Sequence, residues 1–147
     1  MLRACLLLVL LGWASAQTVE LVSRECLGCM CEASSNCDVG FGCVGDLCGP
    51  FKITRGYFLD SELHKEPAFA FQTYESCTRD PFCSAAVIRK YMAKYPRDCN
   101  KDGRRTCTDF AMLHQTGPGG CDANRLASRQ TAYWRKLTSC LALYPGA

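Results

Sequence analysis

Hydrophobic residues recur along this chain at the spacing of amphipathic helices, in short segments separated by polar and glycine-rich stretches. A helix is expected over 26–35, where Leu27 and Met30 share one face. A longer helix is expected to begin at Pro81, because proline is favoured in the first turn. It should end near Tyr95, because the proline that follows disfavours the helical conformation in its predecessor. The pattern therefore predicts a mainly helical protein.

The remaining segments predict shorter elements and a single small β element. The glycine-rich stretch over 36–49 favours a hairpin or a stapled loop. No repeat, linker or second domain is visible, so we predict one α+β domain, mainly helical, with one short β-hairpin. The other expected elements are a strand or turn over 51–59, a surface loop over 61–68, and helices over 69–77, 108–114 and 126–141, the second of which stops at the Gly-Pro-Gly-Gly run of 117–120.

The first sixteen residues have the features of a secretory signal peptide. Arg3 supplies the basic start, an apolar run over 6–11 follows, and Ala14-Ser15-Ala16 is a small-residue cleavage site. The apolar run is too short to span a bilayer, and no later stretch is long and apolar enough. We therefore predict a signal peptide over 1–16, a single domain over 17–147, and a secreted, extracellular protein without a membrane span.

Cysteine is unusually abundant. One of the thirteen cysteines, Cys5, lies in the leader, and the remaining twelve predict six disulfides in an oxidising compartment. A zinc site at 26–31 is disfavoured because secretion favours oxidation over metal binding. Three pairs close in sequence are expected to be local, and the other six cysteines pair among themselves with their connectivity left open. The local pairs are Cys31–Cys37, Cys43–Cys48 and Cys77–Cys83, and the others are Cys26, Cys29, Cys99, Cys107, Cys121 and Cys140.

The net charge of the chain is mild. The whole sequence carries +3, and loss of Arg3 with the leader leaves +2. This is too small to indicate nucleic-acid binding, although it is compatible with an anionic surface such as a bacterial wall. No cofactor is predicted.

One acidic segment has the spacing of a calcium-binding EF loop. It reads Asp98-Cys-Asn100-Lys-Asp102-Gly103, followed by Asp109. However, Pro96 disrupts the entering helix, and two cysteines are expected to staple the loop. A polar turn with a helix cap is the preferred interpretation, and no metal site is predicted.

Several segments carry a family resemblance that extends over nearly the whole chain after the leader and follows the order of the cysteines. In chain order they are Cys26-Leu-Gly-Cys29-Met-Cys31, Cys48-Gly-Pro-Phe-Lys-Ile53, Tyr57-Phe-Leu-Asp60, Cys77-Thr-Arg-Asp-Pro-Phe-Cys83, Tyr91-Met92, Cys107-Thr-Asp-Phe-Ala111, His114 with Gly117-Pro118 and Cys121, and Tyr133-Trp134 before Cys140.

With these segments the chain resembles the invertebrate-type (i-type) lysozymes, which include the destabilases, and looks most like the insect members. The resemblance implies a lysozyme-like fold and hydrolysis of β-1,4 glycosidic bonds in bacterial peptidoglycan, in antibacterial defence or digestion. Typical members have two further cysteines, at the positions of Ser61 and Val87. Both are absent here, as expected if the two are partners.

The resemblance also places the family's catalytic glutamate at Ser34, three residues after Cys31. Glycoside hydrolysis requires two carboxyl groups, one of which protonates the leaving oxygen. A serine hydroxyl cannot supply that proton at neutral pH, and general-acid catalysis contributes about 10²–10⁴-fold. Glu32 is a poor substitute, because two residues turn it roughly 200° around a helix. Muramidase activity is therefore expected to be weak or lost.

The second family carboxylate has two possible alignments. Asp46 stands three residues after Cys43, where the family has its aspartate, but only four residues separate Cys43 from Cys48, whereas the family usually has eight. Counted backwards from Cys48, Asp46 instead falls where the family has a serine. Asp46 is thus either a candidate carboxylate or a turn residue in a shortened loop.

Some destabilase-like members are credited with isopeptidase activity, through a serine with a nearby lysine or histidine. His114 matches the family's histidine, but the lysine position is Thr54, and the serine is deleted or replaced by Asp46. A histidine without its serine is more often a packed or substrate-contacting residue. Aromatic residues could line a sugar groove or fill the core, with the core favoured for Tyr91 and Trp134. This set consists of Phe51, Tyr57, Phe58, Tyr91, Tyr133 and Trp134.

Two functions of different classes follow from the resemblance. The protein is either a working secreted lysozyme or a lysozyme-like protein that lost its acid and acts without catalysis, by binding wall glycan or killing bacteria directly. Peptidoglycan is the expected partner in both.

Overall fold

The computed structural model describes residues 20–123 and 129–147. The predicted signal peptide and the first residues of the expected helix 126–141 lie outside the described residues. None of the helices in the described part of the chain combines the length and apolar character needed to cross a membrane.

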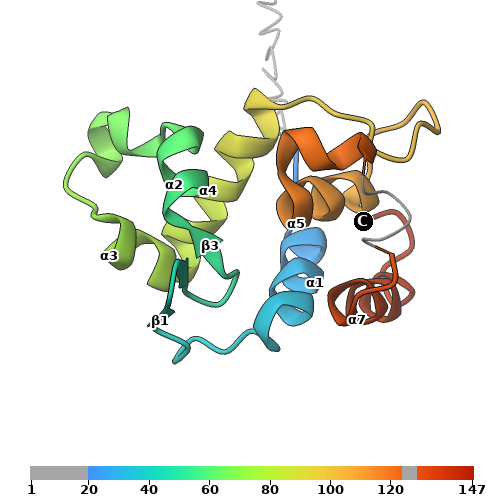
Figure 1. The fold of residues 1–147 in the computed structure, drawn as a ribbon, viewed down its shortest axis with the longest axis horizontal. Coiled ribbons are helices and arrows are strands. Elements are labelled where there is room, and N and C mark those ends of the chain that lie inside the picture. Colours follow the sequence, from blue (N-terminus) through green and yellow to red (C-terminus); the bar gives the residue numbers. More distant parts are fainter. Residues whose placement is uncertain (1–19, 124–128) are drawn as a thin grey trace, which may run out of the picture.

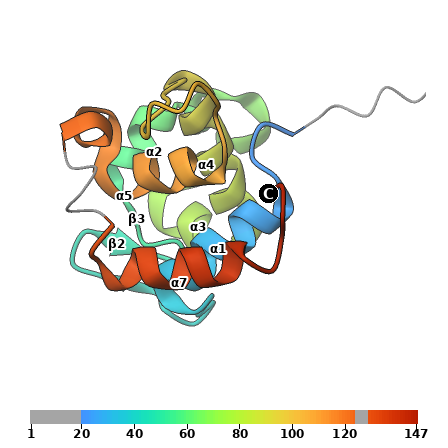
Figure 2. The same cartoon turned by 90° about the vertical axis from the view of Figure 1, so that its right-hand side faces the viewer.

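Helices make up most of the described chain, which confirms the mainly helical α+β prediction. Figure 1 shows α2, α3, α4 and the sheet on one side of the molecule, with α5, α1 and α7 on the other. In Figure 2, α7 runs alongside α1. The helices are α1 (Arg24–Ser35), α2 (Arg55–Ser61), α3 (Tyr74–Arg79), α4 (Pro81–Lys94), α5 (Cys107–Ala123) and α7 (Ala132–Leu141), with 3₁₀ turns η1 (Leu63–Lys65) and η2 (Pro67–Phe69).

The sheet is small, antiparallel and ordered β1-β2-β3. Its strands are β1 (Cys43–Val44), β2 (Leu47–Cys48) and β3 (Ile53–Thr54). The expected hairpin is formed by β1 and β2, with Cys43 directly opposite Cys48 and bonded to it. The sequence did not indicate that β3 would pair with β2 as a third strand.

The turn after β2 requires a glycine for two reasons. Gly49 has a φ of 71°, and a Cβ at this position would lie 1.7 Å from the carbonyl oxygen of Thr78. The chain between β2 and β3 therefore lies directly against the end of α3. This contact explains in physical terms why position 49 requires a residue without a Cβ.

Helix α1 is the centre of the disulfide framework. Cys26 is bonded to Cys107 at the start of α5, and Cys29 is bonded to Cys140 in α7. Cys99 is bonded to Cys121. The structure also joins the three local pairs expected from sequence, Cys31–Cys37, Cys43–Cys48 and Cys77–Cys83. The buried faces of α1, α4 and α5 pack into one core around these bonds.

Local sequence signals predicted the start of α4 correctly and its end to within one residue. The Asp80 side chain accepts a hydrogen bond of 2.7 Å from the amide of Cys83, and Pro81 occupies the first turn. The helix ends at Lys94, one residue before the predicted end.

The prediction of a strand or turn over 51–59 is wrong for its second half. Only Ile53 and Thr54 are strand, and α2 begins at Arg55. The Thr54 side chain accepts a hydrogen bond from the Tyr57 amide at 3.1 Å, so this threonine is an N-cap. The sequence did not predict this helix start, because the aromatic and β-branched composition of the segment favours a strand.

The two neighbouring segments also differ from prediction. The segment over 61–68 lies partly at the surface, but it is not an irregular loop, because η1 lies in it, η2 begins in it, and Leu63 is only 2% exposed. The helix expected over 69–77 is instead α3, which starts at Tyr74 after a capping box between Thr73 and Ser76.

The helix predicted to stop at 117–120 continues to Ala123 after a kink. Gly117 has φ 68° and ψ 178°, and Pro118 then begins the second part. The final helix begins at Ala132 and is capped by Thr131.

Candidate functional site

A groove of about 430 Å³ lies between α1, the sheet, α5 and α7. Two helices that are far apart in the sequence, α1 and α7, both contribute to its wall. Two of the three candidate catalytic residues line it, and Asp46 does not. The described lining residues are Ala33, Ser34, Leu47, Phe51, Lys52, Thr54, His114, Gln115, Ala132, Tyr133 and Lys136.

Ser34 lies in the last turn of α1 and is half-buried. Its hydroxyl donates a hydrogen bond of 2.8 Å to the carbonyl oxygen of Met30, one turn earlier in the same helix. The hydroxyl therefore satisfies a backbone carbonyl and offers no ionisable group to the groove.

Glu32 is exposed and belongs to another face of α1. It lines a separate hollow together with Arg24 and Tyr144. The half-turn of helix between Glu32 and Ser34 thus keeps this carboxylate out of the groove that Ser34 lines.

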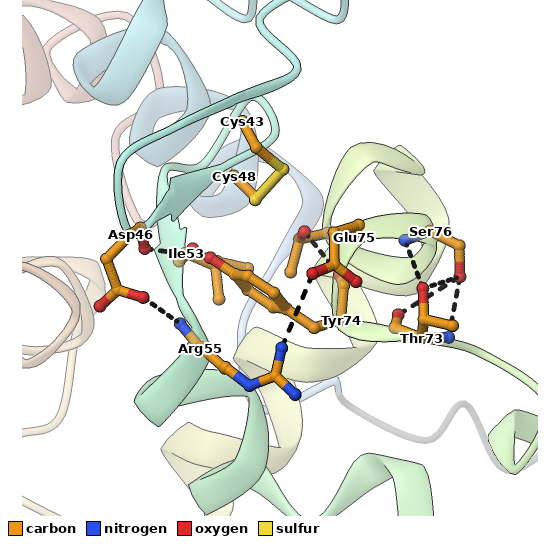
Figure 3. Close-up of polar contacts among 10 residues, drawn as sticks. Cys43, Asp46, Cys48, Ile53, Arg55, Thr73, Tyr74, Glu75 and Ser76 are labelled. Atoms are coloured by element: carbon orange, nitrogen blue, oxygen red, sulfur yellow. Dashed lines mark hydrogen bonds and ion pairs between the residues drawn. A yellow bond between two sulfur atoms is a disulfide. The ribbon is translucent and has the colours of Figure 1, made fainter.

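Asp46 lies in the tight turn between β1 and β2, and its side chain is directed at the backbone of Arg55 (Figure 3). One carboxylate oxygen accepts a hydrogen bond from the Arg55 amide at 3.4 Å. The Asp46 carbonyl oxygen lies 3.0 Å from the hydroxyl of Tyr74, which also lies 2.8 Å from the carbonyl oxygen of Ile53. Tyr74 therefore links the β1–β2 turn to β3, and the Asp46 carboxylate links the same turn to the start of α2.

His114 projects from α5 with both ring nitrogens engaged. Nε2 lies 3.0 Å from the carbonyl oxygen of Phe51, and Nδ1 lies 3.3 Å from the hydroxyl of Tyr57. A carbonyl can only accept, so Nε2 carries the proton and Nδ1 accepts from Tyr57. Burial lowers the pKa of His114 to about 4, against a smaller opposite effect of the Phe51 carbonyl. The ring is therefore neutral at physiological pH.

Thr54, where the resemblance predicts the family's lysine position, lines the groove and caps α2. Among the described residues no serine is hydrogen-bonded to His114. The serine–base pair of an isopeptidase is therefore not assembled in this part of the structure.

The family model described as Destabilase matches residues 23–140 of the chain. The chain belongs to the destabilase family. Lysozyme 1 of Crassostrea virginica is 34% identical over 121 residues, which cover 80% of this chain and 59% of the oyster protein. Invertebrate-type lysozyme 6 of Caenorhabditis elegans is 29% identical over 128 residues, covering 83% of this chain and 89% of that protein.

Solved lysozymes share the fold of this destabilase-family chain. The inhibitor-bound lysozyme of Meretrix lusoria superposes with a TM-score of 0.64 at 28% identity, covering 86% of this chain and 96% of that chain. The Tapes japonica lysozyme superposes with a TM-score of 0.64 at 29% identity, covering 85% and 95% respectively. The resemblance to i-type lysozymes and the lysozyme-like fold are both confirmed.

Two polar atoms in the groove wall are buried without a hydrogen-bond partner among the described residues. They are Oε1 of Gln115 and the hydroxyl of Tyr133. The other end of the Gln115 amide donates to the hydroxyl of Thr131 at 2.9 Å, which fixes the side chain in place. Burial raises the pKa of Tyr133, so its hydroxyl keeps its proton. The groove of this family member therefore contains an unused acceptor and an unused donor.

The aromatic residues divide between core and groove. Phe51, Phe58 and Tyr91 are buried, and Tyr57 stacks on Tyr91 with ring centroids 3.7 Å apart. Of the six aromatic residues considered from sequence, only Phe51 and Tyr133 line the groove. Trp134 packs against the core, as the sequence favoured.

The acidic segment after α4 uses its carboxylates on the backbone. Asp109 is fully buried and accepts from the amides of Cys99 and Thr106, both at 2.9 Å. Asp98 accepts from the amides of Asp102 and Gly103. Within the described ranges no group of three His, Cys, Asp or Glu residues is placed to hold a metal ion.

A larger hollow of about 670 Å³ is mainly apolar and includes Leu27, Val39 and Phe82 in its lining. It contains none of the three candidate catalytic residues. Sequence reasoning missed three polar groove residues, Lys52, Gln115 and Lys136. Lys52 stands inside the Cys48–Ile53 family segment and Gln115 adjoins His114, so a signal existed for both, whereas Lys136 had none.

Proposed function

We propose that this protein is a secreted i-type lysozyme-family member that engages bacterial peptidoglycan in the groove, with muramidase activity that is weak or lost. The family membership supports the substrate, since the relatives are named lysozymes. The predicted leader and the six disulfides support secretion.

The observation that carries the proposal is the absence of a carboxylate from the described groove lining. Glycosidases place one carboxyl group on each side of the scissile bond, one as acid and the other as nucleophile or base. Ser34 hydrogen-bonds to its own helix, and Asp46 closes a turn outside the lining. His114 is neutral and already bonded, so it supplies no acid.

Glycan binding without hydrolysis has its own support in the two unpartnered groove atoms. A buried polar group without a partner costs about 1–3 kcal/mol. An acetamido group offers both an N–H donor and a carbonyl acceptor, which match in type the acceptor Oε1 of Gln115 and the donor hydroxyl of Tyr133. An N-acetylated sugar therefore carries the chemical groups that these two side chains lack.

Retention on insoluble peptidoglycan tests this binding function. The proposal expects the purified protein to be retained, and Tyr133→Phe to weaken retention by roughly three- to tenfold, the worth of one hydrogen bond. The same variant should be as stable as the wild type or more so, because the substitution removes an unpartnered hydroxyl. Tyr144→Phe, outside the groove, serves as the matched control and should change nothing. Failure of the wild type to bind the wall would refute the proposal.

A further inference from the structure

The charged side chains of the groove are both lysines. Lys52 and Lys136 are the only Lys, Arg, Asp or Glu residues in the described lining. Because His114 is neutral, the two lysines set the charge of this surface. A groove with two cations and no anion presents a positive potential to its ligand.

Neither lysine has a carboxylate partner among the described residues. Lys52 lies over the ring of Phe41, 5.2 Å from its centroid, and Lys136 donates to the side-chain oxygen of Asn36 at 2.8 Å. Three lysines outside the groove form ion pairs: Lys65 with Glu62, Lys90 with Glu66, and Lys94 with Asp60. The groove lysines therefore keep their charge available for a ligand.

Two separate elements hold these charges at the groove. Lys52 is fixed by the turn that joins β2 to β3, in which its amide donates to the carbonyl oxygen of Gly49 at 2.9 Å. Lys136 lies one turn beyond Ala132 and Tyr133 on the same face of α7. Their convergence is thus a property of the folded chain.

We infer that Lys52 and Lys136 determine the charge specificity of the groove: they bind carboxylate groups of the glycan, so that its acidic form binds more tightly than its neutral form. This inference rests on the proposed function and names the residues that set the charge preference of the same site. Both lysines are accessible point charges, so the preference should weaken as salt screens them.

The test compares one glycan in two charge states. A phosphate-free peptidoglycan glycan fragment, stripped of its peptides, keeps a carboxylate on alternate sugars, and amidation neutralises those groups without changing the sugar rings. By titration calorimetry at low salt, the acid form should bind about five- to tenfold more tightly than the amide, from two ion pairs of moderate strength.

Variants assign that difference to the lysines. In Lys52→Gln/Lys136→Gln the two forms should bind within about twofold of each other, while the affinity for the amide stays near that of the wild type. Lys65→Gln/Lys90→Gln removes the same amount of charge outside the groove and should keep the preference. Equal binding of both forms by the wild type, or a preference that survives in the groove variant, would overturn this inference alone. Failure to bind either form would overturn the proposed function with it.

Discussion

Ser34 lines the groove at the position where the family resemblance predicts a catalytic glutamate. The last turn of α1 presents this position to the groove, so the backbone needed for a catalytic acid is in place. The side chain there bonds to the Met30 carbonyl oxygen instead. A longer acidic side chain would extend past this carbonyl into the groove.

Ser34→Glu should therefore raise the rate of wall clearing by at least about tenfold. The gain should stay below the full 10²–10⁴-fold worth of a general acid, because the second carboxylate is still absent from the lining. Turbidity of a bacterial wall suspension measures the rate. Glu32→Gln should change nothing, and a well-folded Ser34→Glu protein with no gain would show that the acid is not the limiting loss.

His114 makes stability depend on pH. Its folded pKa of about 4 lies below the usual histidine pKa of 6.5, so the unfolded chain binds more protons between these values. Stability is therefore complete above about pH 6.5 and decreases as the pH falls toward 4. Asp60 and Glu62 are carboxylates that pair with Lys94, and the hydrogen bonds from this lysine lower their pKa values. Their contribution to stability is therefore lost only at more acidic pH.

Between pH 7 and pH 5 we expect the free energy of unfolding to fall by about 1–2 kcal/mol because of His114. Urea unfolding at the two pH values measures it. His114→Gln should remove most of the difference, and His64→Gln, which changes the other histidine, should keep it. An unchanged pH dependence in His114→Gln would contradict the assignment.

Elements were predictable where a local signal governs them and missed where tertiary packing does. Asp80 and Pro81 define the start of α4 through interactions between residues that are close in the sequence. By contrast, α2 has only seven residues and packs against α4, so composition alone suggested a strand or turn. The pairing of β3 with β2 likewise depends on the close approach at Gly49.

The kink in α5 is an element-scale feature that glycine makes possible. Gly117 combines a φ of 68° with a ψ of 178°, a conformation that residues with a Cβ rarely adopt. Gly117→Ala should lower the free energy of unfolding by about 1–3 kcal/mol. Gly119→Ala is the matched control, because a Cβ there meets nothing within 4 Å, and it should be neutral or slightly stabilising. Equal stabilities of the two variants in urea unfolding would contradict this account.

At the scale of the molecule, the long-range disulfides join segments that the sequence leaves far apart. Cys29–Cys140 spans 111 residues and attaches α7 to α1, whereas Cys77–Cys83 spans only 6. All four cysteines are buried, so the cavities left by alanine are comparable. In the chain-entropy description the longer bond stabilises by about 2.5 kcal/mol more.

Cys29→Ala/Cys140→Ala should accordingly destabilise the protein more than Cys77→Ala/Cys83→Ala. Denaturant unfolding of both double variants measures the difference. Equal losses, or a larger loss for the short loop, would contradict the role given to α7 docking.

The same long-range assembly limits what sequence could say about the groove. Ser34 and His114 were identified through the family resemblance, and the fold brings both to one surface. The alignment of Asp46 stayed open because its loop is shortened, and the structure places it in a turn outside the lining. The charge of the groove comes from Lys52 and Lys136, whose convergence depends on the docking of α7 onto α1. No local pattern encodes that convergence.

The most direct measurement of the central claim is the release of reducing sugar ends from purified peptidoglycan by the wild-type protein. A groove without a carboxylate should release them at no more than about a hundredth of the rate of a working i-type lysozyme assayed in parallel, as expected for loss of the general acid. Binding to the same peptidoglycan should persist. Release at the full rate of the working enzyme would contradict the account.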